Sequence, residues 1–326
     1  MNIKNKLLAA NIIIKSKLFN KAIPLAIRWQ LTNRCTSMCK YCNVWKIKSK
    51  ELTTKQIFSV VDELAKMGTQ RISLIGGEPL LRNDIGQIID YCKDYDFHIT
   101  LTSNGKLVPK RIKEIRKADL LKLSFDGPKK IHDFMRQKGS YLDVLKAIEV
   151  AKNNNMKVML NTTLTKYNLD SIGFILETAK RFDITVKFQP VSDACSYSKK
   201  HVEHLSPKIE EYRNAISRIM TLKKSNNYIV NSIKGLKYLL DWPNPKPLKC
   251  YAGKIICRIA SNGNIYPCTI MENKTKVLNY VNLGFKKAFD NLPRVSCRTC
   301  WCSSTLELNC LLSFNPETIF NLRKWL

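Results

Sequence analysis

Three cysteines near one end of the chain have a spacing that suits metal chemistry. Cys35, Cys39 and Cys42 form a C-x3-C-x2-C run directly after an apolar segment. Structural zinc usually takes two ligand pairs, and no partner pair of cysteines follows before Cys250. Disulfides need an oxidising compartment, and nothing in the sequence points to export. Because Fe–S clusters normally use four cysteines, three thiolates indicate a [4Fe–4S] cluster that keeps one iron open for another ligand.

A second group of cysteines lies toward the other end of the chain. The sequence has 12 cysteines, and the two outside both groups, Cys92 and Cys195, are expected to be buried small apolar residues. Clustering at ligand-like spacings predicts two metal centres in a reducing cytosol rather than a disulfide framework. The second group comprises Cys250, Cys257, Cys268, Cys297, Cys300, Cys302 and Cys310.

Strand-like and helix-like segments alternate from residue 25 to residue 190. Strict alternation predicts a parallel sheet with right-handed crossovers. Six units, rather than eight, favour an α/β partial barrel, in which chemistry belongs at the carboxyl ends of the strands. The strand-like runs are 25–31, 71–75, 97–102, 120–125, 157–164 and 184–189. The helical segments are 53–67, 83–94, 109–117, 140–154 and 168–181, with further helical stretches near 207–224 and 231–241.

Polar motifs stand at the predicted carboxyl ends of these strands. The run 25–31 delivers the cysteine loop, and 71–75 leads into Gly76-Gly77-Glu78-Pro79. Adjacent glycines let a backbone approach a ligand closely, although Gly-Gly before proline is also an ordinary turn. The later strand ends carry Ser103-Asn104, then Ser124 with Asp126 and Arg136 beyond it, then Asn161 with Thr163, and finally Gln189.

These motifs together resemble those of the radical S-adenosylmethionine (radical SAM) enzymes. The cysteine run, with Tyr41 in the aromatic position before the last cysteine, is similar to the family's cluster motif. The GGEP sequence and the segments 102–105 and 124–136 are similar to its further motifs. The resemblance implies a (β/α)6 TIM-like core, in which the open iron chelates SAM and the cluster's electron cleaves SAM to a 5′-deoxyadenosyl radical.

By the same resemblance, residues at the strand ends would contact SAM. Glu78 and the backbone carbonyls at Gly76 and Gly77 would accept hydrogen bonds from its ammonium group. Ser124 and Arg136 would meet its carboxylate, a task that suits a guanidinium. His132 is interpreted as a packing or capping residue rather than a general base. Of the others, Ser103 and Asn104 would face SAM, and Asp126 would shape the site or meet substrate. One of Asn161 and Thr163 would contact the ribose, and Gln189 would lie near the adenine.

The second cysteine group resembles the twitch and SPASM extensions of this family. Cys250-x12-Gly263-x4-Cys268, followed by Cys297-x2-Cys300, has their spacing, with a β-hairpin turning at the glycine. It implies a small Cys-rich domain with one auxiliary [4Fe–4S] cluster on Cys250, Cys268, Cys297 and Cys300. Cys257, Cys302 and Cys310 are then spare, or ligands of a partial second cluster. Four thiolates suit zinc equally well, so zinc is the alternative for this group.

The chain is strongly basic, with a formal net charge of +29 from Lys+Arg 55 and Asp+Glu 26. Such a charge favours acidic partners, anionic membranes or nucleic acid, but a compositional bias would also spread it along the chain as observed. No Arg-rich block indicates nucleic acid, which is disfavoured. The expected domains are a basic amphipathic helix at 1–24, packed on the barrel or lying on a membrane surface, the core at 25–190, a helical connector at 191–249, and the cysteine-rich domain at 250–326.

The sequence therefore predicts a cytoplasmic radical SAM enzyme. Peripheral contact with the inner membrane surface is a second expectation for its location. Its substrate is expected to be a lipid or envelope precursor, with a peptide or protein as the alternative. Flavodoxin or ferredoxin would supply electrons, because acidic carriers suit a basic surface. The rival from another class is a non-catalytic Fe–S or zinc protein that binds nucleic acid, which leaves the polar motifs at successive strand ends unexplained.

Overall fold

In the computed structural model, the described residues are 22–191, 202–242, 244, 247–272, 275–293 and 300–313. The expected helix at 1–24 therefore lies almost entirely outside them. None of the helices in these ranges is long and apolar enough to cross a membrane. The first part of the chain comprises β1 Ala26–Gln30, η1 Val44–Lys46, α2 Thr54–Lys66, β2 Arg71–Ile75, η2 Pro79–Leu81, α3 Ile85–Asp94, β3 His98–Ser103, α4 Val108–Ile115, β4 Leu120–Ser124, α5 Lys129–Met135, α6 Ser140–Asn153, β5 Val158–Leu164, η3 Leu169–Ser171, α7 Ile172–Arg181 and β6 Thr185–Pro190.

The second part begins with two helices and ends in short strands and helices. They are α9 Ile209–Lys224, α10 Ile233–Leu240, β7 Ile256–Ile259, β8 Asn264–Tyr266, η5 Thr269–Met271, β9 Leu278–Asn279, α11 Tyr280–Leu283, α12 Phe285–Asp290 and α13 Ser303–Leu312.

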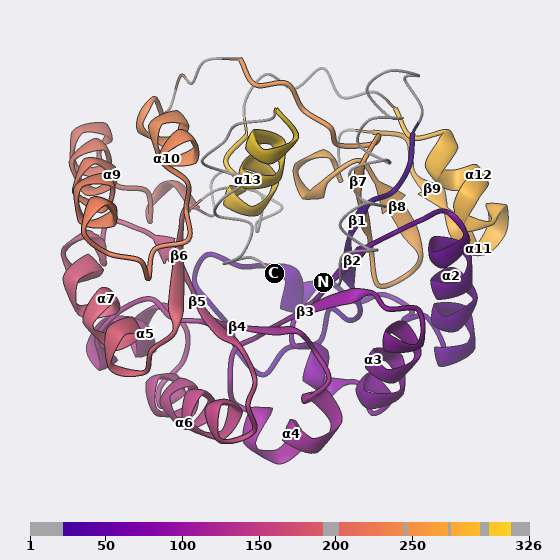
Figure 1. Ribbon diagram of the computed structural model, residues 1–326, viewed down its shortest axis with the longest axis horizontal. Helices are drawn as coiled ribbons and strands as arrows, with labels where there is room; N and C mark the ends of the chain where they lie inside the picture. Colours follow the sequence, from indigo (N-terminus) through magenta and orange to yellow (C-terminus); the bar gives the residue numbers. More distant parts are fainter. Residues whose placement is uncertain are drawn as a thin grey trace.

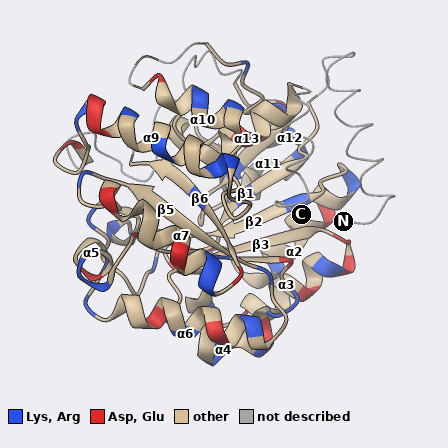
Figure 2. Cartoon of the chain, turned by 60° about the vertical axis from the view of Figure 1, so that its left-hand side comes forward, with Lys and Arg blue, Asp and Glu red and all other residues tan. Residues whose placement is uncertain are grey.

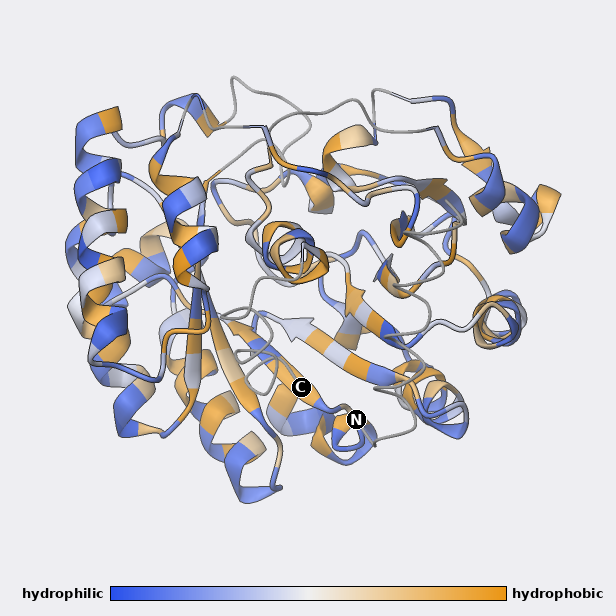
Figure 3. Ribbon diagram, turned by 45° about the horizontal axis from the view of Figure 1, so that its top comes forward, coloured by the Kyte–Doolittle hydropathy of each residue, from blue (hydrophilic) through white to orange (hydrophobic). Residues whose placement is uncertain are grey.

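Nine strands form one sheet in the order β6-β5-β4-β3-β2-β1-β7-β8-β9. Neighbours from β1 to β6 are parallel throughout, so the prediction of six alternating units around a parallel sheet is confirmed. The helices lie in a ring outside the curved strands, and α13 lies inside the ring (Figure 1). Figure 3 shows hydrophobic strands surrounded by helices with one hydrophilic and one hydrophobic side.

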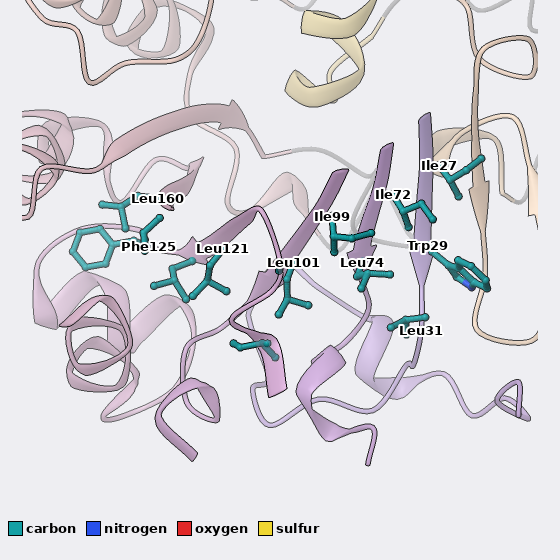
Figure 4. Packing of buried hydrophobic residues seen from close by; sticks show 14 of the residues in the cluster. Ile27, Trp29, Leu31, Ile72, Leu74, Ile99, Leu101, Leu121, Phe125 and Leu160 are labelled. Carbon is teal, nitrogen blue, oxygen red and sulfur yellow. The ribbon is translucent and has the colours of Figure 1, made fainter. Parts of the chain in front are cut away.

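Alternate strand residues supply a hydrophobic core between the sheet and the helices that cover its outer face (Figure 1). Because successive side chains of a strand point to opposite faces, Ile27 and Trp29 of β1, and Leu31 directly after it, share one face with Ile72 and Leu74 of β2. Figure 4 shows these side chains together with those of β3, β4 and β5. The opposite face of the same strands is polar, and it is the interior of the barrel.

The cysteine-rich segment continues the barrel sheet. Strand β7 pairs in parallel with β1, and β8 and β9 follow it antiparallel. Gly263, at a φ of 86°, makes the turn between β7 and β8. Helix α12 is joined to α2 because the Glu63 carboxylate accepts hydrogen bonds from the amides of Phe285 and Lys286 at 3.2 and 3.0 Å. The sheet thereby extends beyond β1, whereas β6 is its other edge.

Replacing Leu121 with alanine tests the helix-covered core. This side chain is completely buried on β4, so truncation should lower the free energy of unfolding by about 2–5 kcal/mol through lost burial and a cavity. Leu142→Ala, on the exposed surface of α6, should change it by less than about 0.5 kcal/mol. Urea unfolding of the two variants measures the difference, and equal stability of both would contradict this core.

Candidate functional site

The loop that follows β1 carries the first three cysteines and is held from several sides. The Cys42 amide donates to the Cys39 carbonyl at 3.0 Å, which makes a tight turn. The Lys40 amide donates to the carbonyl of Met135, at the end of α5, at 2.9 Å. Trp45 donates from its indole nitrogen to the Cys42 carbonyl at 2.9 Å. The conformation of the cysteine loop therefore depends in part on α5, the helix that follows β4.

Hydrogen-bond donors stand close to two of the three sulfurs. The Ser37 amide lies 3.4 Å from the Cys35 sulfur, and the Asn104 side-chain nitrogen lies 3.9 Å from it. Arg136 places Nη1 3.7 Å from the Cys39 sulfur. Burial raises the pKa of Cys35 to about 11 and also raises that of Cys39, so both are neutral thiols until a cation displaces their protons.

The two glycines after β2 are required by contact with the cysteine loop. The Gly77 amide donates to the Thr32 carbonyl and the Glu78 amide to the Arg34 carbonyl, both at 2.8 Å. A Cβ atom on Gly76 would stand 2.6 Å from the Thr32 oxygen, and one on Gly77 would stand 2.2 Å from the Arg34 oxygen. These glycines therefore make room for the backbone of the cysteine loop, in addition to any ligand.

Glu78 ties the end of β2 to the end of β3. It is completely buried, and its carboxylate accepts hydrogen bonds from the Ser103 hydroxyl at 3.1 Å and the Asn104 amide at 2.8 Å. Its other oxygen accepts from the Leu80 amide at 3.2 Å. Burial outweighs these hydrogen bonds and raises the pKa of Glu78 to about 7. The sequence indicated a ligand contact here, and the structure adds a link between two loops.

Asp126, beyond β4, is the acceptor on which several site residues converge. Its carboxylate accepts from Arg136 Nε at 2.8 Å, from the Tyr41 hydroxyl at 2.9 Å and from the Thr163 amide at 3.1 Å. Its own amide donates to Nδ1 of His132 at 3.1 Å. Asp126 therefore orients the guanidinium beside Cys39 and the aromatic residue before Cys42.

His132 is a packing residue in the structure. It is completely buried against Phe125, with ring centroids 5.4 Å apart. Because Nδ1 accepts a hydrogen bond, the neutral ring carries its proton on Nε2. Burial, and then the charge of Arg136, lowers the pKa of His132 to about 4, so the ring is uncharged at neutral pH.

The remaining predicted contacts stand on the interior face of the last three strands. Ser124 is paired with Asn161 in register across β4 and β5, and Thr163 with Gln189 across β5 and β6. Gln189 donates to the Thr163 hydroxyl at 3.4 Å. These residues face the same interior as the loops after β1, β2 and β3, as expected for carboxyl ends of parallel strands.

Four of the described cysteines from the second group are electrostatic neighbours. Burial raises the pKa of Cys268 to about 11, and the thiols of Cys302 and Cys250 raise it further. Burial, and then the charges of Cys302, Cys250 and Cys268, raise the pKa of Cys300 as well. Arg28 donates to the Cys302 sulfur at 3.0 Å, and although burial opposes it, this cation lowers the pKa of Cys302. No disulfide forms among the described cysteines.

Two other cysteines of this group are completely buried. Cys257 is completely buried on β7, paired in register with Ile27 and packed in the helix-covered core. Cys310 is buried on α13. Cys297 lies outside the described residues. Of the four cysteines expected to hold an auxiliary cluster, the structure describes Cys250, Cys268 and Cys300. Cys302 is a fourth neighbour of these three.

Sequence reasoning missed several residues that position the site. Asn168 donates to the carbonyls of Asp126 and Thr163 at 3.0 and 2.9 Å and so fixes the backbone after β4 and β5. Glu51 accepts from Arg34 Nε at 2.9 Å and from the Thr32 hydroxyl, at the base of the cysteine loop. Neither residue belongs to a motif, because its partners lie on other segments of the chain.

The residues around Cys35, Cys39 and Cys42 fit a [4Fe–4S] cluster with one open iron. The three thiols share one loop, two sulfurs face hydrogen-bond donors, and donors of this kind tune bound clusters. Among the described residues, no three Cys, His, Asp or Glu side chains converge on the position of a single metal ion. Cysteines of a cluster bind separate irons, so they stand further apart than the ligands of one ion.

Gly77→Ala should separate the two loops. Its Cβ would meet backbone oxygens of Asn33 and Arg34 at 2.5 and 2.2 Å, so the cysteine loop must move. We expect a loss of about 1–3 kcal/mol of stability and a lower iron content after reconstitution. Gly173→Ala on α7 is the control, because its Cβ would meet only the flexible end of Arg218 at 3.4 Å. Full iron loading of Gly77→Ala would refute the constraint.

Glu78→Gln should change how stability depends on pH. A folded-state pKa of about 7, above the ordinary 4.5, means that the protonated carboxyl is favoured by folding. The wild type should therefore lose stability relative to Glu78→Gln as pH rises from about 4.5 to 7, by an amount on the order of 3 kcal/mol.

Melting temperatures of both proteins between pH 4.5 and pH 8 measure this difference. Glu149→Gln, on the exposed surface of α6, should follow the wild type at every pH. A constant offset between the wild type and Glu78→Gln across this range would show that Glu78 titrates as an ordinary carboxyl.

Comparison with known proteins shows what this chain is similar to. The model of the Radical SAM superfamily matches residues 29–179. Mycofactocin maturase MftC of Mycolicibacterium smegmatis is 24% identical over 75% of this chain and 64% of its own length. AdoMet-dependent heme synthase of Methanosarcina barkeri is 34% identical over 48% of this chain and 47% of its own length. GTP 3′,8-cyclase of Clostridium botulinum is 27% identical over 78% of this chain and 84% of its own length.

Solved structures share the fold. Streptococcus suis SuiB bound to S-adenosylmethionine superposes with a TM-score of 0.69 at 17% identity, over 86% of this chain and 68% of that one. SuiB has also been solved bound to the precursor peptide SuiA, with a TM-score of 0.67 at 18% identity, over 86% of this chain and 67% of that one. The chain spans less than two thirds of MftC and of the heme synthase. Residues 29–179 therefore match the radical SAM superfamily, whose members are enzymes.

Proposed function

We propose that Cys35, Cys39 and Cys42 hold a [4Fe–4S] cluster at which SAM is reductively cleaved, and that the enzyme modifies its substrate by hydrogen abstraction. The observation that carries this proposal is the convergence on the cysteine loop of the loops after β2, β3 and β4. They contact it through Gly77, Asn104 and Arg136. When bound, the cluster and SAM supply a 5′-deoxyadenosyl radical.

The protein's own part is to position groups and to exclude water. Arg136 is buried and held by Asp126, so its guanidinium is fixed beside the Cys39 sulfur and is available to the SAM carboxylate through its outer nitrogens. Fixing this group before the reaction removes the entropic cost of ordering it later. Glu78, Ser103 and Asn104 keep the neighbouring loops together.

An auxiliary [4Fe–4S] cluster of the twitch or SPASM kind is the second part of the proposal. Its support is the mutual proximity of Cys250, Cys268, Cys300 and Cys302, with Cys297 close to Cys300 in sequence. We favour one auxiliary cluster, for which Cys302 is a candidate ligand beside those expected from the sequence. Cys257, in the helix-covered core, is on the wrong side of the sheet for this set.

For the substrate, the named relatives favour a peptide or protein over the lipid or envelope precursor expected from the sequence. MftC is named as a maturase, and SuiB has been solved with a precursor peptide. We therefore propose a peptide-modifying maturase. We further propose a cytoplasmic enzyme that takes electrons from an acidic carrier such as flavodoxin or ferredoxin, because opposite charges speed association.

Anaerobic reconstitution with iron and sulfide tests the proposed chemistry. With dithionite and SAM, the wild type should form 5′-deoxyadenosine, and Cys35→Ala should lose at least about a thousandfold of this activity because the cluster loses a ligand. Cys92→Ala, a change of a buried cysteine on α3, is the matched control and should retain product formation.

Iron counting in the same samples separates the two parts of the proposal. About 8 irons per chain support one auxiliary cluster, and about 12 support two, at four irons per cluster. About 4 irons would remove the auxiliary cluster alone. No 5′-deoxyadenosine, with zinc in place of iron, would overturn the function.

A further inference from the structure

A buried ion pair adjoins the cysteine loop. Arg136 donates from Nε to the Asp126 carboxylate at 2.8 Å, and the two side chains are 6% and 0% exposed. Figure 2 shows many Lys, Arg, Asp and Glu residues on the helices that surround the sheet, where water screens their charges. The cost of taking two charges out of water offsets their mutual attraction, so stability alone does not account for this buried pair.

The guanidinium of the Arg136–Asp126 pair faces a sulfur of the cysteine loop. Nη1 of Arg136 lies 3.7 Å from the sulfur of Cys39. The donors near Cys35 are the backbone amide of Ser37 and a side-chain amide, at 3.4 and 3.9 Å, and both are neutral. Among these three donors, only Arg136 brings a full charge to a sulfur.

The opposite charges of the pair do not cancel at Cys39. The guanidinium binds Asp126 through Nε and faces the Cys39 sulfur through Nη1. Burial raises the pKa of the Cys39 thiol, and after burial the charge of Arg136, which lowers this pKa, outweighs the charge of Asp126, which raises it. The cation therefore dominates the field at this sulfur, and the carboxylate reduces its effect.

Surrounding hydrogen bonds hold both charges in place. The Asp126 carboxylate also accepts from the Tyr41 hydroxyl at 2.9 Å and from the Thr163 amide at 3.1 Å. The Arg136 amide donates to the carbonyl of His132 at 3.0 Å, and the Asp126 amide donates to Nδ1 of the same residue at 3.1 Å. Because these groups are fixed and buried, their field acts on the cysteine loop without the screening that water would supply.

We propose that Arg136 and Asp126 set the reduction potential of the [4Fe–4S] cluster held by Cys35, Cys39 and Cys42. This inference rests on the proposed function, because it requires a cluster on these three cysteines. Reduction adds one electron, so a cation that donates to a ligand sulfur favours the reduced state and raises the potential. The carboxylate behind the guanidinium has the opposite effect, and it also positions Arg136.

Redox titration of the reconstituted holoenzyme without SAM tests this proposal. Titanium(III) citrate supplies the electrons, and electron paramagnetic resonance of the reduced cluster gives the midpoint potential at one fixed pH. Arg136→Met should lower the potential by about 59 mV or more, which is a tenfold smaller equilibrium constant for a one-electron reduction. Asp126→Asn removes the negative charge at nearly constant volume, so it should raise the potential by a smaller amount.

Matched variants separate charge from structure. Arg136→Lys keeps the positive charge and should recover part of the potential that Arg136→Met loses. Arg181→Met on α7 and Asp94→Asn on α3 remove exposed charges and should leave the potential unchanged, because water screens them. The signal that Cys35→Ala lacks identifies the cluster concerned, since an auxiliary cluster would keep its own signal.

Opposite shifts in Arg136→Met and Asp126→Asn support the proposal, because damage to the cysteine loop would not change sign with the charge removed. If Arg136→Met loses its iron, the direction of the shift in Asp126→Asn decides. The proposal is overturned if the variants keep the wild-type potential, if both shift in the same direction, or if both lose their iron, since the pair would then be structural. Unshifted variants beside a Cys35-dependent signal in the wild type reject this inference alone. Absence of that signal from the wild type rejects the proposed function, and this inference with it.

Discussion

The close approach of the loop after β2 to the cysteine loop is the constraint on which the site depends. Two backbone hydrogen bonds of 2.8 Å join these loops, and only glycine at positions 76 and 77 leaves room for the carbonyl oxygens that they face. Because β1 and β2 are neighbours in a parallel sheet, their carboxyl ends emerge side by side. The contact therefore fixes where the three cysteines stand relative to the sheet.

Buried polar hubs extend this constraint around the barrel. Glu78 connects β2 with the loop after β3, and Asp126 connects the end of β4 with Arg136, Tyr41 and β5. Each hub is fully buried and accepts several hydrogen bonds, which is how an interior polar group avoids the cost of desolvation. The strand ends then behave as one preorganised unit, as a radical reaction requires if water and side reactions are to be excluded.

The barrel has two faces with different physical tasks. Its helix-covered face is apolar and supplies most of the stability through burial, from Ile27 to Phe188. Its interior face carries hydroxyl, amide and cationic groups. The C-terminal segment joins the sheet at β1 and approaches this interior through Arg28, Lys187 and α13. Arg28, on the interior face, and Cys302 of the second cysteine group thus lie on the same side of the sheet.

Local pattern was sufficient to predict much of this protein. Alternation of strand and helix periods predicted six parallel strands, and the spacing of Cys35, Cys39 and Cys42 predicted a site at the end of the first strand. Both predictions succeed because they depend only on residues that are close in sequence. Other features depend on contacts between distant segments: Asn168 beside Asp126, Cys302 beside Arg28, and Glu78 as a link rather than only a ligand contact. Helix α5 and the pairing of β7 with β1 were also missed, since a short helix has little periodicity and strand pairing is non-local. The sequence alone therefore determined the units and their order, whereas only the tertiary structure decided which buried charges and thiols share one environment, because that depends on how the sheet curves and on which segments pack against it.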